Sequence, residues 1–142
     1  MCFLPFLISV NTVPCGRVPL FCFYLKNFGV LKVMNNTLKL NKDFKRLYYR
    51  GKCIPCHNVV VYAQKNNLGK TRVGLTCGKS VGGAVSRNRG KRLMREAFRA
   101  ISPRLNGSYD IVIVARSRIA EKKCDEVLRD VKYAFKKLGI II

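Results

Sequence analysis

Acidic residues and histidine are scarce in this chain. Its 142 residues include only 7 Asp and Glu and one His against 28 Lys and Arg, so the net charge is +21 at pH 7. Hydrolysis by the protein itself would need an acid and a base held near the substrate. A single histidine and scattered carboxylates provide no convincing pair, so we predict no catalytic residue in the chain. The excess positive charge instead calls for an anionic partner.

The cysteines lack the spacing of a disulfide framework. There are seven, an odd number, and reduced thiols in a cytoplasm fit them best. Cys53, Cys56 and His57 have the spacing of a c-type haem attachment site, so an exported cytochrome is one alternative. It explains neither the charge nor the basic helix described below. No second Cys or His pair completes a zinc site, and we predict no bound metal.

Long hydrophobic runs are also missing. The apolar runs 3–10 and 18–25 are separated by Asn11, Pro14 and Arg17, well short of the ~20 residues that span a bilayer. No basic residue precedes the first run, as a secretion signal requires. We therefore predict a cytoplasmic protein with no membrane partner.

Charge divides the chain at Met34. Only Arg17, Lys26 and Lys32 are charged before it, and amphipathic patterning begins only after it. We hypothesise that Met34 is the functional start, that residues 1–33 are a non-structural extension, and that residues 34–142 form one domain.

The order of elements after Met34 is helix, strand, strand, helix, strand, helix. A short helix capped by Asn41 ends at Gly51. Strands are expected at 58–64, 72–77 and 109–115. Longer helices are expected at 84–101, capped by Ser86 or its neighbours, and at 121–138. This order predicts an α+β sandwich with helices packed against a small sheet.

The helix at 84–101 separates apolar from basic side chains. Leu93, Met94, Ala97, Phe98 and Ile101 fall on one side, and Lys91, Arg92, Arg95 and Arg99 on the other. Arg87, Asn88 and Arg89 precede them in the first turn, where free backbone N–H groups favour phosphate. A lone basic helix is more often a solvated face. Arginine nevertheless suits bidentate phosphate contacts, so this helix favours nucleic acid.

A second candidate surface is aromatic. Phe44 and Tyr48 share a helix face, and Tyr62 lies on the following strand. Aromatic residues at helical spacing usually belong to a core. Lysines and arginines interleave with these rings, however, as in grooves where unpaired bases stack.

These motifs closely resemble the protein subunit of bacterial ribonuclease P. The likeness covers about residues 38–138. It rests on Leu40 to Phe44, Arg50-Gly51, Arg72 to Thr76, Lys79, Gly82 to Val85 and, above all, Arg87-Asn88-Arg89-Gly90-Lys91-Arg92-Leu93-Met94-Arg95-Glu96-Ala97-Phe98-Arg99. Gly90 departs from the family, which usually has a large apolar residue there, and Ser80 stands where a second lysine is common.

The resemblance implies a specific task. In the family, a catalytic RNA removes the 5′ leader of precursor tRNA, and the small protein binds both that RNA and the leader. The residues facing the catalytic RNA would be Lys79, Arg87, Asn88, Arg89, Lys91, Arg92 and Arg95. The single-stranded leader would lie against Phe44, Tyr48 and Tyr62. Mg²⁺ would act through the RNA partner, with no protein-bound organic cofactor and no obligatory protein partner.

The family fold is a two-layer α/β sandwich, ribosomal-protein-like, whose small central sheet has an unusual left-handed crossover. A structural protein that binds ribosomal RNA remains an alternative, because it would also be small and basic. It would not need the aromatic cleft. Residues 74–80 read G-x-x-x-G-K-S, one residue short of a phosphate-binding P-loop, and we expect no nucleotide site there.

Overall fold

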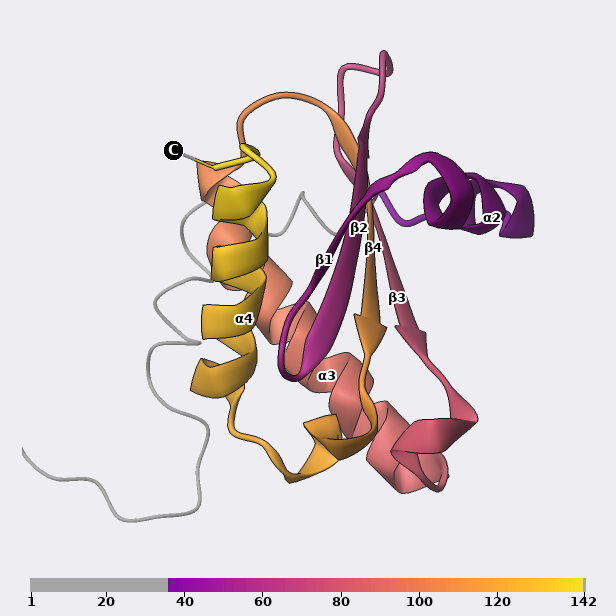
Figure 1. The fold of residues 1–142 in the computed structure, drawn as a ribbon, viewed down its shortest axis with the longest axis vertical. Helices are drawn as coiled ribbons and strands as arrows, with labels where there is room; N and C mark the ends of the chain where they lie inside the picture. The colour runs from indigo at the N-terminus through magenta and orange to yellow at the C-terminus, as the bar shows by residue number, and fades with distance from the viewer. Residues whose placement is uncertain (1–35, 142) are drawn as a thin grey trace, which may run out of the picture.

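A computed structural model of the protein describes residues 36–141 as four strands, three α-helices and three short 3-10 helices (Figure 1). The proposed start at Met34 and the extension 1–33 lie outside the described residues. Within 36–141, no helix combines the length and the apolar character needed to cross a bilayer.

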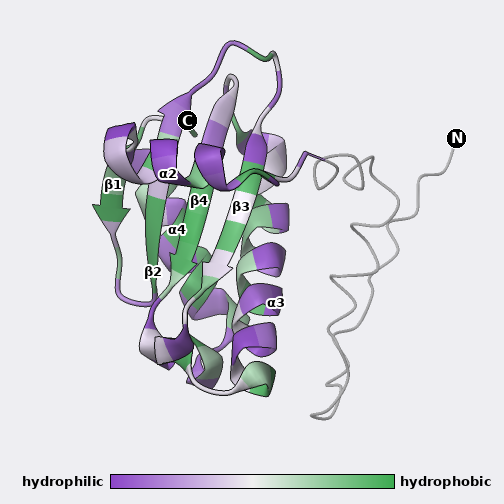
Figure 2. Cartoon of the chain, turned by 90° about the vertical axis from the view of Figure 1, so that its right-hand side faces the viewer, coloured by the Kyte–Doolittle hydropathy of each residue, from purple (hydrophilic) through white to green (hydrophobic). Residues whose placement is uncertain are grey.

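The four strands form one mixed sheet in the order β1-β2-β4-β3. They comprise β1 (Lys52–Pro55), β2 (Val59–Lys65), β3 (Arg72–Cys77) and β4 (Tyr109–Ala115). β2 pairs antiparallel with both β1 and β4, whereas β3 runs parallel to β4. The connection from β3 to β4 passes behind the sheet in Figure 2 and is left-handed, as the family resemblance implied.

Helices cover the two faces of the sheet unequally. The helices α3 (Ala84–Ile101) and α4 (Cys124–Lys137) lie together on one face, where they enclose the main core. The helix α2 (Asn41–Arg50) crosses the other face. Figure 2 shows that it covers only the upper part of that face and leaves the lower ends of β2, β4 and β3 without a helix.

Three details of the sequence prediction are wrong. Residues 52–55 form an edge strand, β1, that the sequence analysis did not predict. α2 starts at Asn41 itself, with Leu40 as its N-cap, and α3 is preceded by Gly83 rather than capped by Ser86. Neither helix has a side-chain cap, so backbone geometry alone sets where they begin.

The last helix also starts later than predicted. Residues 117–121 form a 3-10 helix, η5 (Ser117–Glu121), and α4 begins only at Cys124. There the Glu126 carboxylate accepts a hydrogen bond from the Lys123 backbone N–H at 3.3 Å and closes the first turn. Four apolar residues of α4 are buried in the main core: Val127, Val131, Ala134 and Phe135.

Candidate RNA-binding sites on two faces of the sheet

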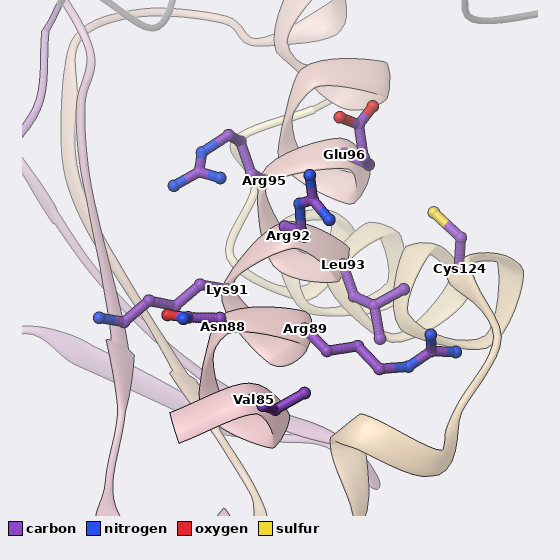
Figure 3. A pocket seen from close by; sticks show the side chains of 9 residues that line it. All are labelled: Val85, Asn88, Arg89, Lys91, Arg92, Leu93, Arg95, Glu96 and Cys124. Atoms are coloured by element: carbon purple, nitrogen blue, oxygen red, sulfur yellow. The ribbon is translucent and has the colours of Figure 1, made fainter. Parts of the chain in front are cut away.

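The basic residues of α3 form one continuous outward face. Met94, Ala97 and Phe98 anchor the helix in the core, which turns Asn88, Arg89, Lys91 and Arg92 to solvent. Figure 3 shows the side chains fanning out from the helix, with Lys91 and Arg95 on one side and Arg89 reaching toward the beginning of α4. Between them lies a groove of about 730 Å³, which Cys124 of α4 borders on the far side.

The cations of this face differ in how firmly they are held. Arg89 donates a hydrogen bond from Nε to the Ala120 carbonyl at 2.7 Å, which ties α3 to η5. Arg99 pairs with Glu96 at 3.1 Å. Within residues 36–141, Arg87, Lys91, Arg92 and Arg95 take part in no ion pair. Their charge is therefore available to an anionic partner.

Gly90 lies within α3 and does not interrupt it. The residue is buried, and a Cβ built on it would lie 3.0 Å from Ile119 Cγ2 and 3.2 Å from Cys77 Sγ. Those two side chains therefore occupy the space that a larger residue at position 90 would fill. Burial raises the pKa of the Cys77 thiol, although Lys91 and Arg87 oppose the shift.

Lys79 stands just before α3. It opens the 3-10 helix η3 (Lys79–Val81) and is exposed, as is Ser80 beside it. The chain therefore carries Lys79 to the same end of the molecule as the first turn of α3 (Figure 1). Residues 74–77 belong to β3, so the near-match to a P-loop is mostly strand.

The three predicted aromatic residues lie on the other face of the sheet. The rings of Tyr48 and Tyr62 pack edge to face with centroids 5.0 Å apart. The Tyr48 hydroxyl lies 3.4 Å from Thr76 Oγ1 on β3. Phe44 lies on Gly74, where a Cβ would come within 2.6 Å of the ring. Tyr48 is 40% exposed, whereas Phe44 and Tyr62 are half-buried, so Tyr48 is the most accessible of these three rings.

The two thiols of the haem-like motif point to opposite faces of the sheet. Cys53 is paired with Tyr62 across the β1–β2 ladder, on the α2 side. Cys56 packs against the main core, and its thiol donates to the Asp130 carbonyl of α4 at 3.4 Å. This arrangement does not suit attachment of one haem. Burial raises the pKa of the Tyr62 phenol, and a side-chain hydrogen bond with Cys53 raises it further.

The sequence analysis missed a group of charged residues beneath α2. Asp110 of β4 is 1% exposed and accepts hydrogen bonds from Arg72, Arg46 and Asn66. Burial alone would raise the pKa of Asp110, but the bonds from Arg72 and Asn66 and the charge of Arg46 hold it below its ordinary value. The signal that the sequence offered for this group was Asp110 itself, an acidic residue within the apolar run 109–115.

A second groove was also missed. It has a volume of about 520 Å³ and lies on the uncovered part of the α2 face, where the sequence gives no periodic signal. Val60 and Val114, paired across β2 and β4, form part of its floor, and its rim includes His57, Arg116 and Arg118. In the described residues, no group of three or more His, Cys, Asp or Glu side chains could hold a metal ion.

Comparison with known proteins links this geometry to one family. The sequence profile described as Ribonuclease P matches residues 34–139. A ribonuclease P protein component from Alkaliphilus metalliredigens is 36% identical over 107 residues, covering 75% of this chain and 96% of the relative. One from Pelotomaculum thermopropionicum is 36% identical over 110 residues, with 78% and 97% covered.

Solved structures agree with this match. The RNase P protein of Staphylococcus aureus aligns with a TM-score of 0.67 at 27% identity, covering 75% of this chain and 97% of that one. The RNase P protein from Thermotoga maritima aligns with a TM-score of 0.64 at 27% identity, covering 72% and 96%.

Proposed function

This chain belongs to the ribonuclease P protein family, and we propose that its two surfaces divide the work between catalyst and substrate. As the protein component of this endoribonuclease, it assists 5′ processing of precursor tRNA. In our proposal, the α3 face binds the catalytic RNA and the α2 face binds the single-stranded leader.

The proposal that the α3 face binds the catalytic RNA rests on the row of basic residues on α3 that form no ion pair in the described part of the chain. Arg87, Lys91, Arg92 and Arg95 have no ion-pair partner in residues 36–141, and Arg89 and Asn88 stand beside them on the exposed face. Folded RNA presents phosphates to such a surface, and guanidinium groups contact phosphate in a bidentate manner. Lys79 extends the same face from η3.

The proposal that the α2 face binds the leader is supported by aromatic rings that lie over the sheet next to a groove. Single-stranded nucleic acid binds where bases stack on rings and a basic groove follows the backbone. Tyr48 and Tyr62 supply rings, and the neighbouring groove with Arg116 and Arg118 at its rim supplies positive charge. We infer that Phe44, packed on Gly74, supports this surface as well as contacting the leader.

We propose that Mg²⁺ is held by the RNA partner. The side chains in 36–141 bring together no carboxylate or histidine cluster suited to a metal ion. The protein would therefore act by binding and orienting RNA, with no proton transfer assigned to its own side chains.

Reconstitution with the matching catalytic RNA tests this division. Tyr48→Ala should weaken binding of leader-bearing tRNA by roughly 1 to 3 kcal/mol, the range for loss of one base–aromatic stack, and leave mature tRNA unaffected. Tyr133→Ala is the matched control, because Tyr133 is an exposed tyrosine on α4, 54% accessible and away from the cleft. Equal losses for both tRNA forms in Tyr48→Ala would contradict a leader site.

A further inference from the structure

Four charged residues connect α2 to the sheet in an alternating cluster. α2 contributes Asp43 and Arg46, and the sheet contributes Arg72 and Asp110; we call these four residues the Asp110 cluster. Each acid contacts both arginines. Two of the seven acidic residues in a chain of charge +21 are therefore used at this one junction.

Asp110 is the centre of the cluster. Arg72 approaches it in a bidentate manner, with Nε 2.8 Å from Oδ1 and Nη2 2.6 Å from Oδ2. Arg46 Nη2 lies 2.8 Å from Oδ2, and Asn66 Nδ2 lies 2.7 Å from Oδ1. A buried carboxylate is costly unless its oxygens are paired in this way. Such pairs contribute less to net stability than to holding their partners in one geometry.

Within residues 36–141, the other contacts that hold α2 on the sheet come from a small apolar cluster and from the rings of Phe44 and Tyr48. The buried residues of α2 are Asp43 and Leu47 alone, and the apolar cluster under it contains only three buried residues, Leu38, Leu47 and Val112. Apolar contacts tolerate sliding and rotation because they are not directional. Hydrogen-bonded ion pairs are directional, so the Asp110 cluster orients the helix more strictly than the apolar contacts or the single 3.4 Å hydrogen bond from the Tyr48 hydroxyl to Thr76 Oγ1.

The aromatic rings depend on that orientation. Phe44 directly follows Asp43 on α2, and its ring lies on Gly74, two residues beyond Arg72 on β3. One turn further along the helix, Tyr48 meets Tyr62 and Thr76. A small rotation of α2 would therefore remove both rings from their places above the sheet.

We propose that Asp110 is a positioning residue for leader binding, which acts by fixing α2, through Arg46 and Arg72, so that its aromatic rings stand over the sheet. Asp110 itself is buried and touches no RNA in this scheme. The inference rests on the proposed leader site and adds the device that orients it.

Asp110→Asn in the reconstituted holoenzyme tests the inference. The variant keeps the shape of the side chain and removes the charge that holds the two arginines. We expect the affinity for precursor tRNA to fall about tenfold, the loss of one stacked base, with affinity for mature tRNA and for the catalytic RNA unchanged within about twofold. Retention of the full preference for precursor over mature tRNA would overturn the proposal, as would an equal loss for both.

Asp130→Asn is the matched control. Asp130 of α4 accepts hydrogen bonds from the Asn58 backbone N–H at 2.7 Å and from Asn58 Nδ2 at 2.9 Å, on the opposite side of the sheet from α2. The Asp130→Asn variant should retain the preference for precursor over mature tRNA even if its melting temperature is lower. If Asp130→Asn also lost that preference, general loosening of the domain would explain both results, and the proposal would fail.

A second pair of variants covers the case in which Asp110→Asn does not fold. Arg46→Gln removes one of the two arginines of the cluster, and its side chain is 43% exposed, so the change disturbs the fold less than a change at Asp110. Lys45→Gln removes one positive charge from the neighbouring exposed position. Arg46→Gln should lose several-fold more precursor preference than Lys45→Gln. Equal losses would mean that charge alone matters, which would overturn the positioning role.

Combining Asp110→Asn with Tyr48→Ala distinguishes the positioning role of Asp110 from the leader site itself. If Asp110 acts through the rings, Asp110→Asn should cause a smaller loss of precursor preference in a Tyr48→Ala background than in the unmodified protein, because only the Phe44 ring is then left to displace. Additive losses would contradict that route. If Tyr48→Ala alone has no effect, the leader site itself is wrong, whatever Asp110→Asn does.

Discussion

The two faces of the sheet are built in different ways from the same four strands. On the α3 and α4 side, nineteen buried hydrophobic residues form one continuous core. On the α2 side, three buried hydrophobic residues among 36–141 form a small cluster, and a cluster of charges adds to that apolar contact. One face is thus suited to hold the fold together, and the other leaves sheet surface and rings exposed for a ligand.

Charges are used differently on the two sides as well. On α3, most of the basic residues point outward without ion pairs in residues 36–141, while the apolar side of the helix carries the packing. On α2, Arg46 and Asp43 point back to the sheet and help to attach the helix. Substitutions on the two faces should therefore separate stability, catalytic-RNA binding and leader binding.

The largest effect is expected in the main core. Phe135 is fully buried and packs edge to face on Phe98, with ring centroids 6.2 Å apart. Phe135→Ala should lower the free energy of unfolding by about 3 to 5 kcal/mol in urea denaturation. Leu47→Ala, in the small cluster under α2, should cost less in stability but more in precursor preference. Equal losses of stability in Phe135→Ala and Leu47→Ala would show that the two faces contribute similarly to the stability of the fold.

Gly74→Ala should have the next largest effect. Its Cβ would fall 2.6 Å from the Phe44 ring, so the ring must move or the strand must shift, at about 1 to 3 kcal/mol. We expect a loss of stability that Phe44→Leu partly rescues, because the smaller side chain leaves room, and a loss of precursor binding that Phe44→Leu does not rescue, because it removes the ring. Gly78→Ala, whose Cβ would make only an ordinary 3.6 Å contact with Ser80 Oγ, is the control. Failure of the rescue would argue against this contact as the cause.

Arg92→Ala tests the opposite surface. Loss of one phosphate contact should weaken catalytic-RNA binding by roughly 1 to 2 kcal/mol and reduce the slope of log affinity against log salt by about one. Stability should not change, because Arg92 is exposed. Arg89→Ala should in addition lower stability, because it removes the hydrogen bond to the Ala120 carbonyl. An unchanged salt slope in Arg92→Ala, like that expected of Arg129→Ala on α4, would contradict the phosphate role.

Periodicity predicted most of the fold because the core elements have strong patterns. The strands predicted at 72–77 and 109–115 and the helix predicted at 84–101 are present with those bounds, and the strand predicted at 58–64 is present one residue later, at 59–65. β1 was missed because Lys52–Pro55 is a short edge strand, exposed at three of its four positions and ending in proline, with no periodic signal. The left-handed crossover came from the family resemblance, since general rules favour the other hand.

The candidate sites were predictable only in part, for a related reason. A basic helix face and an aromatic pair are local patterns, and in the structure Tyr48 packs on Tyr62 while Phe44 lies on Gly74 of the same sheet face. Apart from the Asp43–Arg46 pair within α2, the Asp110 cluster joins residues 29 to 64 positions apart, and no local pattern encodes such contacts. The same holds for Ile119 and Cys77, which make a glycine at position 90 compatible with a buried helix.

Gly90→Ala should give the smallest effect and tests how tightly the α3 face is packed. Alanine favours the helix by about 1 kcal/mol over glycine. Its Cβ, however, would lie 3.0 Å from Ile119 Cγ2 and 3.2 Å from Cys77 Sγ, so those side chains must move by a few tenths of an ångström. The two effects oppose each other, and we expect the free energy of unfolding to change by less than about 1 kcal/mol. Gly90→Ala combined with Ile119→Val should recover part of the helix gain, measured as a higher stability than Ile119→Val alone. If Gly90→Ala alone stabilised the protein by the full helix increment, the core beneath α3 would be looser than the structure indicates.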